Sequence, residues 1–357
     1  MTELAMKVAT DRARGALLGA LAGDAAGATL EFIGRVPTAA EVEAAMRMVG
    51  GGVWRTAPGQ ITDDGELTLA LARALCGQPG YDAGRVARHY RAWCLSRPFD
   101  IGNATYNALG TGDPDDPQLA TLMRRNAMRL NAESKANGSL MRASALGVWS
   151  AGVAPGAAIE AARHDARLTH PHPTCQWAGV AYVLAIRQLL LCPGDATGAL
   201  AAAASGLTAD DAGEVRAWLD DARAARWPAF HPQAGFVRIA FTCAFAHLAR
   251  VSTYAEALAA TLAGGGDTDT NACIVGGLIG ALQGEQAIPA VMRSAVLTCD
   301  TTRGQPRPEW LQTRQCGPVL DGLWPRRRPE RQPGPAQDPP GPAGATGLPG
   351  HRTRRRS

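Results

Sequence analysis

Residues 264–282 read GGGDTDTNACIVGGLIGAL, and the rest of the chain is organised around them. Three glycines precede two carboxylates with threonine hydroxyls beside them, and an apolar run from Ala272 to Leu282 follows. The run predicts a buried helix whose glycines let other backbone pack close. Because Asp267, Asp269 and Thr270 stand at the start of this helix, they are well placed to hold a charged partner or a hard cation.

A second stretch, TDDGELTLALA at residues 62–72, has the same build. Thr62, Asp63 and Asp64 stand just before another strong helical run that starts at Glu66. The two stretches together offer four carboxylates and several hydroxyls, and all of these donors are oxygen. This donor set suits Mg²⁺ or Mn²⁺ and does not suit Zn²⁺.

The alternative is that both stretches are ordinary helix caps. Asp and Thr are common at helix N-termini, and residues 63–66 (DDGE) fit a capping box as they stand. A cap needs one side-chain oxygen, however, and each stretch supplies three. The pairing of two such stretches therefore favours a metal site.

The two stretches resemble the two metal-binding signatures of the ADP-ribosylglycohydrolase family. Four further segments match that family in the same order: GDAAGATLEF at 23–32, PFDIGNAT at 98–105, NGSLMR at 137–142, and Thr169-His170 before a long helix. The resemblance covers about residues 12–300. It implies a binuclear site with two divalent cations, Mg²⁺ or Mn²⁺, whose ligands are Thr62, Asp63, Asp64, Asp267, Asp269 and Thr270.

The same resemblance assigns the remaining site residues. It makes Asp100 and Glu31 the catalytic carboxylates, although an acid in a loop or turn is more often a solvated charge or a cap. It gives contacts with the ADP-ribose to Asn103, Glu133, Asn137, Gly138, Ser139 and His170. Asp24 is expected to be a buried, hydrogen-bonded carboxylate that supports a neighbour.

Composition indicates an all-α protein, because alanine and leucine dominate and β-branched runs are scarce. We expect a compact single-domain multi-helix bundle over residues 12–323, with the metal site at helix N-termini. Residues 1–11 are expected to be a flexible lead-in. Residues 324–357 are rich in Pro, Gly and Arg and predict a disordered tail.

The net charge of +4 comes from that tail, because residues 325–357 hold eight Arg against two acidic residues. The remaining 28 basic and 30 acidic residues leave the folded part near neutral, which argues against nucleic-acid binding.

The eight cysteines are scattered without a CxxC pair, and they predict reduced thiols in a cytoplasmic protein. The N-terminal apolar run is interrupted by Asp24 and is too short to span a bilayer. Few aromatic residues suggest a monomer.

The resemblance predicts a metal-dependent hydrolase that removes ADP-ribose from ADP-ribosylated arginine on a target protein, with dinitrogenase reductase as one candidate. Three alternatives stay open. The first is hydrolysis of O-linked ADP-ribose or small ADP-ribosyl compounds, and the second is a non-catalytic ADP-ribose sensor. The third is a purely structural helical protein, for which four acidic residues at two buried helix starts would be an unexplained cost.

Overall fold

The structure is a computed structural model that describes residues 3–324, and this part of the chain forms one compact unit of helices without a strand. The α-helices are α1 (Glu3–Gly27), α2 (Ala39–Met46), α3 (Asp63–Leu75), α4 (Ala83–Leu95), α5 (Asn103–Leu109), α6 (Leu119–Leu130), α7 (Ala143–Ser150), α8 (Pro155–Ala166), α9 (Pro173–Leu191), α10 (Ala196–Ser205), α11 (Gly213–Arg223), α12 (Val237–Ala249), α13 (Tyr254–Ala263), α14 (Thr268–Gln283), α15 (Ala290–Leu297) and α16 (Gly317–Leu323). The all-α prediction is confirmed.

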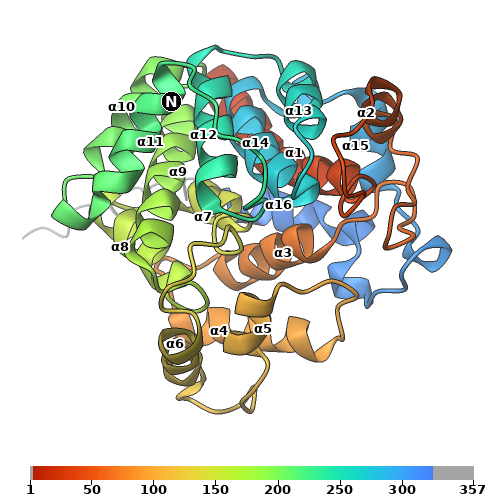
Figure 1. Cartoon of the computed structure of the whole chain (residues 1–357). Coiled ribbons are helices and arrows are strands. Elements are labelled where there is room, and N and C mark those ends of the chain that lie inside the picture. The colour runs from red at the N-terminus through yellow and green to blue at the C-terminus, as the bar shows by residue number, and fades with distance from the viewer. Residues whose placement is uncertain (1–2, 325–357) are drawn as a thin grey trace, which may run out of the picture. The chain divides into compact units, whose positions relative to one another are not determined.

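The centre of the bundle is the antiparallel pair of α1 and α14, which lie side by side in Figure 1. Glycines on α1 set their spacing, because there is no room for a Cβ atom between the helices. A Cβ on Gly15 would lie 2.4 Å from the Gly280 carbonyl oxygen, and one on Gly23 would lie 2.1 Å from the Ala272 carbonyl oxygen. This close approach carries the end of α1, with Asp24, to the start of α14.

The Gly23→Ala substitution is expected to destabilise the protein by about 2–3 kcal/mol, because the new methyl group meets the backbone of α14, which cannot move aside as a flexible side chain does. Thermal or denaturant unfolding measures the loss. Gly156→Ala on α8 is the matched control, since a Cβ there meets nothing within 4 Å. Equal stability of the two variants would contradict the tight α1–α14 contact.

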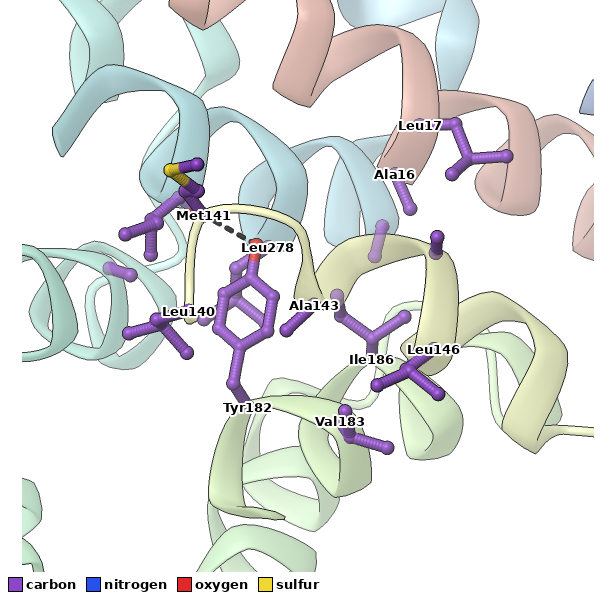
Figure 2. Close-up of a cluster of buried hydrophobic side chains, with 14 of the residues drawn as sticks. Ala16, Leu17, Leu140, Met141, Ala143, Leu146, Tyr182, Val183, Ile186 and Leu278 are labelled. Carbon is purple, nitrogen blue, oxygen red and sulfur yellow. Dashed lines mark hydrogen bonds between the residues drawn. The ribbon is translucent and has the colours of Figure 1, made fainter. Parts of the chain in front are cut away.

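Helix α9 packs behind this pair and closes the core. Tyr182 of α9 lies among Leu140, Met141 and Leu278 in Figure 2. Its hydroxyl donates to the Ile274 carbonyl on α14 over 2.8 Å, so a buried polar group is satisfied and α9 is tied to the central pair. The Cys273 thiol of α14 donates to the Met141 carbonyl over 3.4 Å, which ties the 137–142 loop to α14.

Several expected boundaries differ from the structure. Helix α1 begins at Glu3 rather than Arg12, because Ala9 is already buried against the core. No helix was predicted where α2 lies, and Thr38 starts it with a capping box. Trp324, expected in the tail, is 7% exposed and belongs to the folded part. The predicted tail over 325–357 lies outside the described residues.

Within residues 3–324, none of the helices combines the length and the hydropathy that a bilayer-spanning segment needs.

Candidate active site

The starts of α3 and α14 meet beside the end of α1, and their polar side chains do not act as caps. Thr62 and Asp267 are the N-cap residues of the two helices, and neither makes a side-chain capping hydrogen bond. Thr62 instead donates its hydroxyl to Asp24 over 2.8 Å, and Thr270 donates to Asp64 over 3.3 Å. The interpretation of these stretches as plain caps is therefore wrong.

Two groups of three carboxylates form where these helices meet. Asp24, Asp64 and Asp269 place one oxygen each within 4.8 Å of one another, and Glu31, Asp267 and Asp269 do the same. We call these groups the inner and outer triads, and Asp269 belongs to both. Each triad has the size and the oxygen donors of a hard-cation site, so the pair is the arrangement that two neighbouring divalent cations would need.

The inner triad shows why cations fit this chain. The Oδ1 atom of Asp64 is buried and has no hydrogen-bond partner among residues 3–324. Asp24 already accepts from the Thr62 N–H, the Thr62 hydroxyl and the Gly65 N–H. This confirms that Asp24 supports a neighbour, and its place in the inner triad adds a second role that the sequence did not indicate. A buried carboxylate oxygen with no partner is costly unless a cation or a proton compensates it.

The pKa values of the clustered carboxylates are raised, as expected for buried negative charges that lie close together. Burial, followed by repulsion from Asp24, raises the pKa of Asp63 to about 8. Burial and then repulsion from Asp100 raise the pKa of Glu31 to about 8. The pKa values of Asp64 and Asp269 also lie well above the ordinary value, with burial again the main cause. Divalent cations would relieve this repulsion and keep the carboxylates ionised.

A cavity of about 680 Å³ opens onto the outer triad. Ten of the predicted site residues line it: Glu31, Asp63, Asp100, Asn103, Asn137, Gly138, His170, Asp267, Asp269 and Thr270. Thr62 and Asp64 are buried and are not part of its lining. Ser139 is also buried outside the lining, with no partner for its hydroxyl. Glu133 is exposed and does not reach the cavity, so its expected contact with ligand lacks support in this arrangement.

Asp100 reaches the cavity on the loop between α4 and α5. Burial, then repulsion from Asp63 and Asp267, raises its pKa to about 8. Glu31 also lines the cavity, and its Oε2 accepts from the Trp54 indole N–H over 2.7 Å. The Trp54 ring lies between Phe32 and Phe99, with ring centroids 6.2 and 6.0 Å away. Sequence reasoning did not identify Trp54, because it lies in a loop with no recognisable motif.

A buried network supports the opposite wall of the cavity. Arg142 is fully buried and pairs with Asp165 over 2.9 Å. It also donates to the Gly138 carbonyl over 3.0 Å and to the Thr169 hydroxyl over 2.9 Å. That hydroxyl meets His170 Nδ1 at 2.8 Å, so one guanidinium fixes both the 137–139 loop and the histidine.

His170 is a neutral ring in this setting. Burial and then the nearby Arg142 lower its pKa to about 3. A neutral imidazole offers one donor and one acceptor, so it can hydrogen-bond a ligand but carries no proton to deliver at neutral pH. Asn137 completes the wall by donating to Asp267 Oδ2 over 2.7 Å, which ties the outer triad to the 137–139 loop.

The sequence pattern of the ADP-ribosylglycohydrolase family matches residues 6–323, and the chain belongs to this family. A protein of Acanthamoeba polyphaga mimivirus that carries the provisional name ADP-ribosyl glycohydrolase is 31% identical over 318 residues, which is 82% of this chain and 92% of the relative. A solved structure named ADP-ribosylglycohydrolase-related protein complex superposes with a TM-score of 0.66 at 27% identity, covering 89% of this chain and 98% of the other.

Shorter matches show higher identity. The ADP-ribosyl-[dinitrogen reductase] glycohydrolase of Rhodospirillum rubrum is 45% identical over 93 residues, covering 26% of this chain and 32% of the relative. The ADP-ribosylarginine hydrolase Tri1 of Pseudomonas putida is 47% identical over 108 residues, covering 28% of each chain. Family membership makes this chain a glycohydrolase-type hydrolase, and the bond that it cleaves is a separate question.

Proposed function

We propose that the protein hydrolyses the N-glycosidic bond between ADP-ribose and the guanidine of an arginine side chain, with two divalent cations, Mg²⁺ or Mn²⁺, bound at the two triads. The observation that carries the proposal is the pair of carboxylate triads sharing Asp269, at the base of a cavity that also holds Asp100 and Glu31. The arginine linkage is supported by the name of the Pseudomonas relative, which matches 28% of this chain.

The triads and the two threonines would hold the cations. The ligands would be Asp24, Thr62, Asp63, Asp64, Asp267, Asp269, Thr270 and, at the outer triad, Glu31. When bound, such cations would lower the pKa of a water molecule and hold the ribose hydroxyls. The chain supplies the remaining requirements, which are positioning of the ribose and transfer of two protons.

Asp100 and Glu31 are the candidate groups for proton transfer. Cleavage of a glycosidic bond passes through an oxocarbenium-like state, in which the attacking water must lose a proton and the leaving guanidine must be protonated. Both carboxyl groups line the cavity, where each can reach a bound water or a leaving group. We assign to Asp100 both the acceptance of the proton that the water loses and its delivery to the leaving guanidine, and we assign Glu31 to orientation of the ribose.

The remaining lining residues would bind the rest of the ligand. Asn103, the 137–138 backbone and the neutral His170 present uncharged donors and acceptors to the cavity. Backbone N–H groups near Gly138 suit a diphosphate, and a Cβ there would meet the His170 ring at 2.9 Å. Gly138 therefore keeps the loop and the histidine close enough to contact one ligand.

The test is release of free ADP-ribose from an arginine-ADP-ribosylated protein. Release is expected with Mn²⁺ or Mg²⁺ and is expected to stop with EDTA. ADP-ribosylated dinitrogenase reductase and an unrelated ADP-ribosylated protein are assayed side by side, since a difference in rate tests the protein partner. Hydrolysis of serine-linked ADP-ribose alone would replace the arginine linkage with an O-linked one. Metal-dependent binding of ADP-ribose without any hydrolysis would overturn the enzyme proposal.

A further inference from the structure

The segment Gly304–Arg307, here called the C-terminal strap, contacts the loop that leads to Asp100 and the Trp54 loop, whose indole donates to Glu31. It lies between two short 3-10 turns, Thr301–Arg303 and Glu309–Leu311. The strap itself does not line the cavity. Its contacts therefore act on the site only through the loops that it holds.

Arg307 is the charged anchor of the strap and is 8% exposed. Its Nε donates to Glu66 Oε1 over 2.6 Å and its Nη2 donates to Glu66 Oε2 over 2.9 Å. Trp93 of α4 donates to the same carboxylate over 2.7 Å. Glu66 sits in the first turn of α3, two residues after Asp64, so the strap is fixed to the helix that carries part of the inner triad.

The other donors of Arg307 hold the loop that leads to Asp100. Nη1 donates to the Ser96 carbonyl over 3.0 Å and to the Arg97 carbonyl over 3.1 Å. Nη2 also donates to the Ser96 hydroxyl over 2.7 Å. Arg97 has a φ of 55°, a conformation that a non-glycine residue keeps only when neighbours hold it. The Arg307 guanidinium therefore links α3 to the loop that leads to Asp100, at a point three residues before that carboxylate.

The first half of the strap holds the Trp54 loop in the same way. Gln305 donates its amide to the Trp54 carbonyl over 2.6 Å, and Trp54 in turn donates to Glu31. The Gln60 side chain bonds the Gln305 backbone twice. Its Oε1 accepts from the Gln305 N–H over 2.9 Å, and its Nε2 donates to the Gln305 carbonyl over 2.6 Å. At Gly304 a Cβ would lie 2.2 Å from the Ala57 nitrogen, so the strap runs directly against this loop.

We propose that the C-terminal strap is a positioning element for both carboxylates, with Arg307 the positioning residue for Asp100 and Gln305 the positioning residue for Glu31. The catalytic part of this inference rests on the proposed function. Arg307 makes two bonds to one carboxylate and three to the Ser96–Arg97 loop. A lysine ammonium at this position would keep the ion pair with Glu66. It lacks the planar fork of the guanidinium, so it cannot bond the Glu66 carboxylate and the Ser96–Arg97 loop at the same time.

The test uses Arg307→Lys, with Arg14→Lys as the matched control. Arg14 also ties the C-terminal region to the body, through Glu285 over 2.6 Å and Asp321 over 2.5 Å, and it does not line the cavity. Amide hydrogen exchange of the metal-free proteins is measured first. Arg307→Lys is expected to accelerate exchange about tenfold or more in residues 96–102, with helices α1 and α14 unchanged, and the control is expected to leave that loop as it is.

Steady-state kinetics with ADP-ribosylarginine substrate form the second readout. Arg307→Lys is expected to lower kcat on the order of 10–100-fold while KM changes little, because a displaced carboxylate slows proton transfer more than it weakens binding. Gln305→Ala keeps the ion pair and serves as the second variant. It is expected to accelerate exchange in residues 52–56 and to lower kcat with KM retained.

Two results would overturn the proposal. In the first, both variants exchange at wild-type rates, Arg307→Lys in residues 96–102 and Gln305→Ala in residues 52–56. The other is a uniform rise of exchange in all helices, which would show a purely structural role. If the wild-type protein releases no ADP-ribose, the proposed function fails by itself, while the exchange of the two loops still decides whether the strap positions them.

Discussion

Replacing Asp269 with asparagine is expected to lower kcat/KM for ADP-ribose release by about 10³-fold or more. Asp269 is the one residue shared by the inner and outer triads, so this change weakens both proposed cation sites at once. An asparagine has nearly the same shape but lacks the negative charge that a divalent cation needs from its ligands. Loss of the cations would remove both the activation of water and the positioning of the ribose hydroxyls.

The measurement pairs initial rates with a calorimetric titration of Mn²⁺. Asp195→Asn is the matched control, because Asp195 is also an acidic residue at a helix start, where it accepts from the Gly198 N–H over 2.8 Å. Asparagine is an equally good cap, so this control is expected to keep wild-type rates. An Asp269→Asn variant that bound Mn²⁺ and hydrolysed substrate like the wild type would contradict a cation site at the triads.

The carboxylate cluster was predictable because its donors follow a local rule. Each acidic stretch stands directly before an apolar helical run, and such runs are read from sequence with confidence in their type. The glycines of the 264–282 stretch indicated close packing of other backbone, and Gly276 and Gly280 do meet α1 there. The two local signals together placed both stretches near one centre, although the partner helix α1 was not identified.

The supporting residues were not predictable, because their roles depend on contacts between distant parts of the chain. Asp165 and Arg142 are 23 positions apart and form a buried pair that no local pattern indicates. Arg307 reaches Glu66 across 241 positions. Such pairs follow from the tertiary arrangement, in which a buried charge must find its partner wherever the fold brings one. Sequence patterns therefore identify the donors at helix starts and miss the groups that hold them in place.

The helix boundaries also differ in whether a local sequence signal marks them or packing decides them. The start of α2 carries a complete capping box from Thr38 to Glu41, which is a local signal that was not recognised in the sequence. The start of α1 carries no such signal. Residues 3–11 are helical because they continue a helix whose later turns are buried, and that continuation depends on packing against the core.

The metal-free protein is expected to lose stability as the pH rises from about 5 to about 8. The folded-state pKa values of Glu31, Asp63 and Asp100 are raised to about 8, above the ordinary values of 4.5 for Glu and 3.8 for Asp. A group whose folded pKa is raised stabilises the fold fully below its unfolded pKa, and that contribution is lost as the pH rises through the folded pKa. Because the groups repel one another, their joint effect is on the order of several kcal/mol.

Thermal unfolding in EDTA between pH 5.5 and 8.5 measures this effect, and the Tm is expected to fall by at least about 5 °C. Added Mg²⁺ or Mn²⁺ is expected to remove most of the fall, since bound cations balance the carboxylates and stabilise the folded state. The Asp64→Asn variant separates the two causes. It removes a buried charge whose Oδ1 has no partner, so it should raise the metal-free Tm at pH 8 and flatten the pH dependence. A Tm that stays level or rises in EDTA would show that the carboxylates are already compensated within the chain and would remove the physical reason for placing cations there.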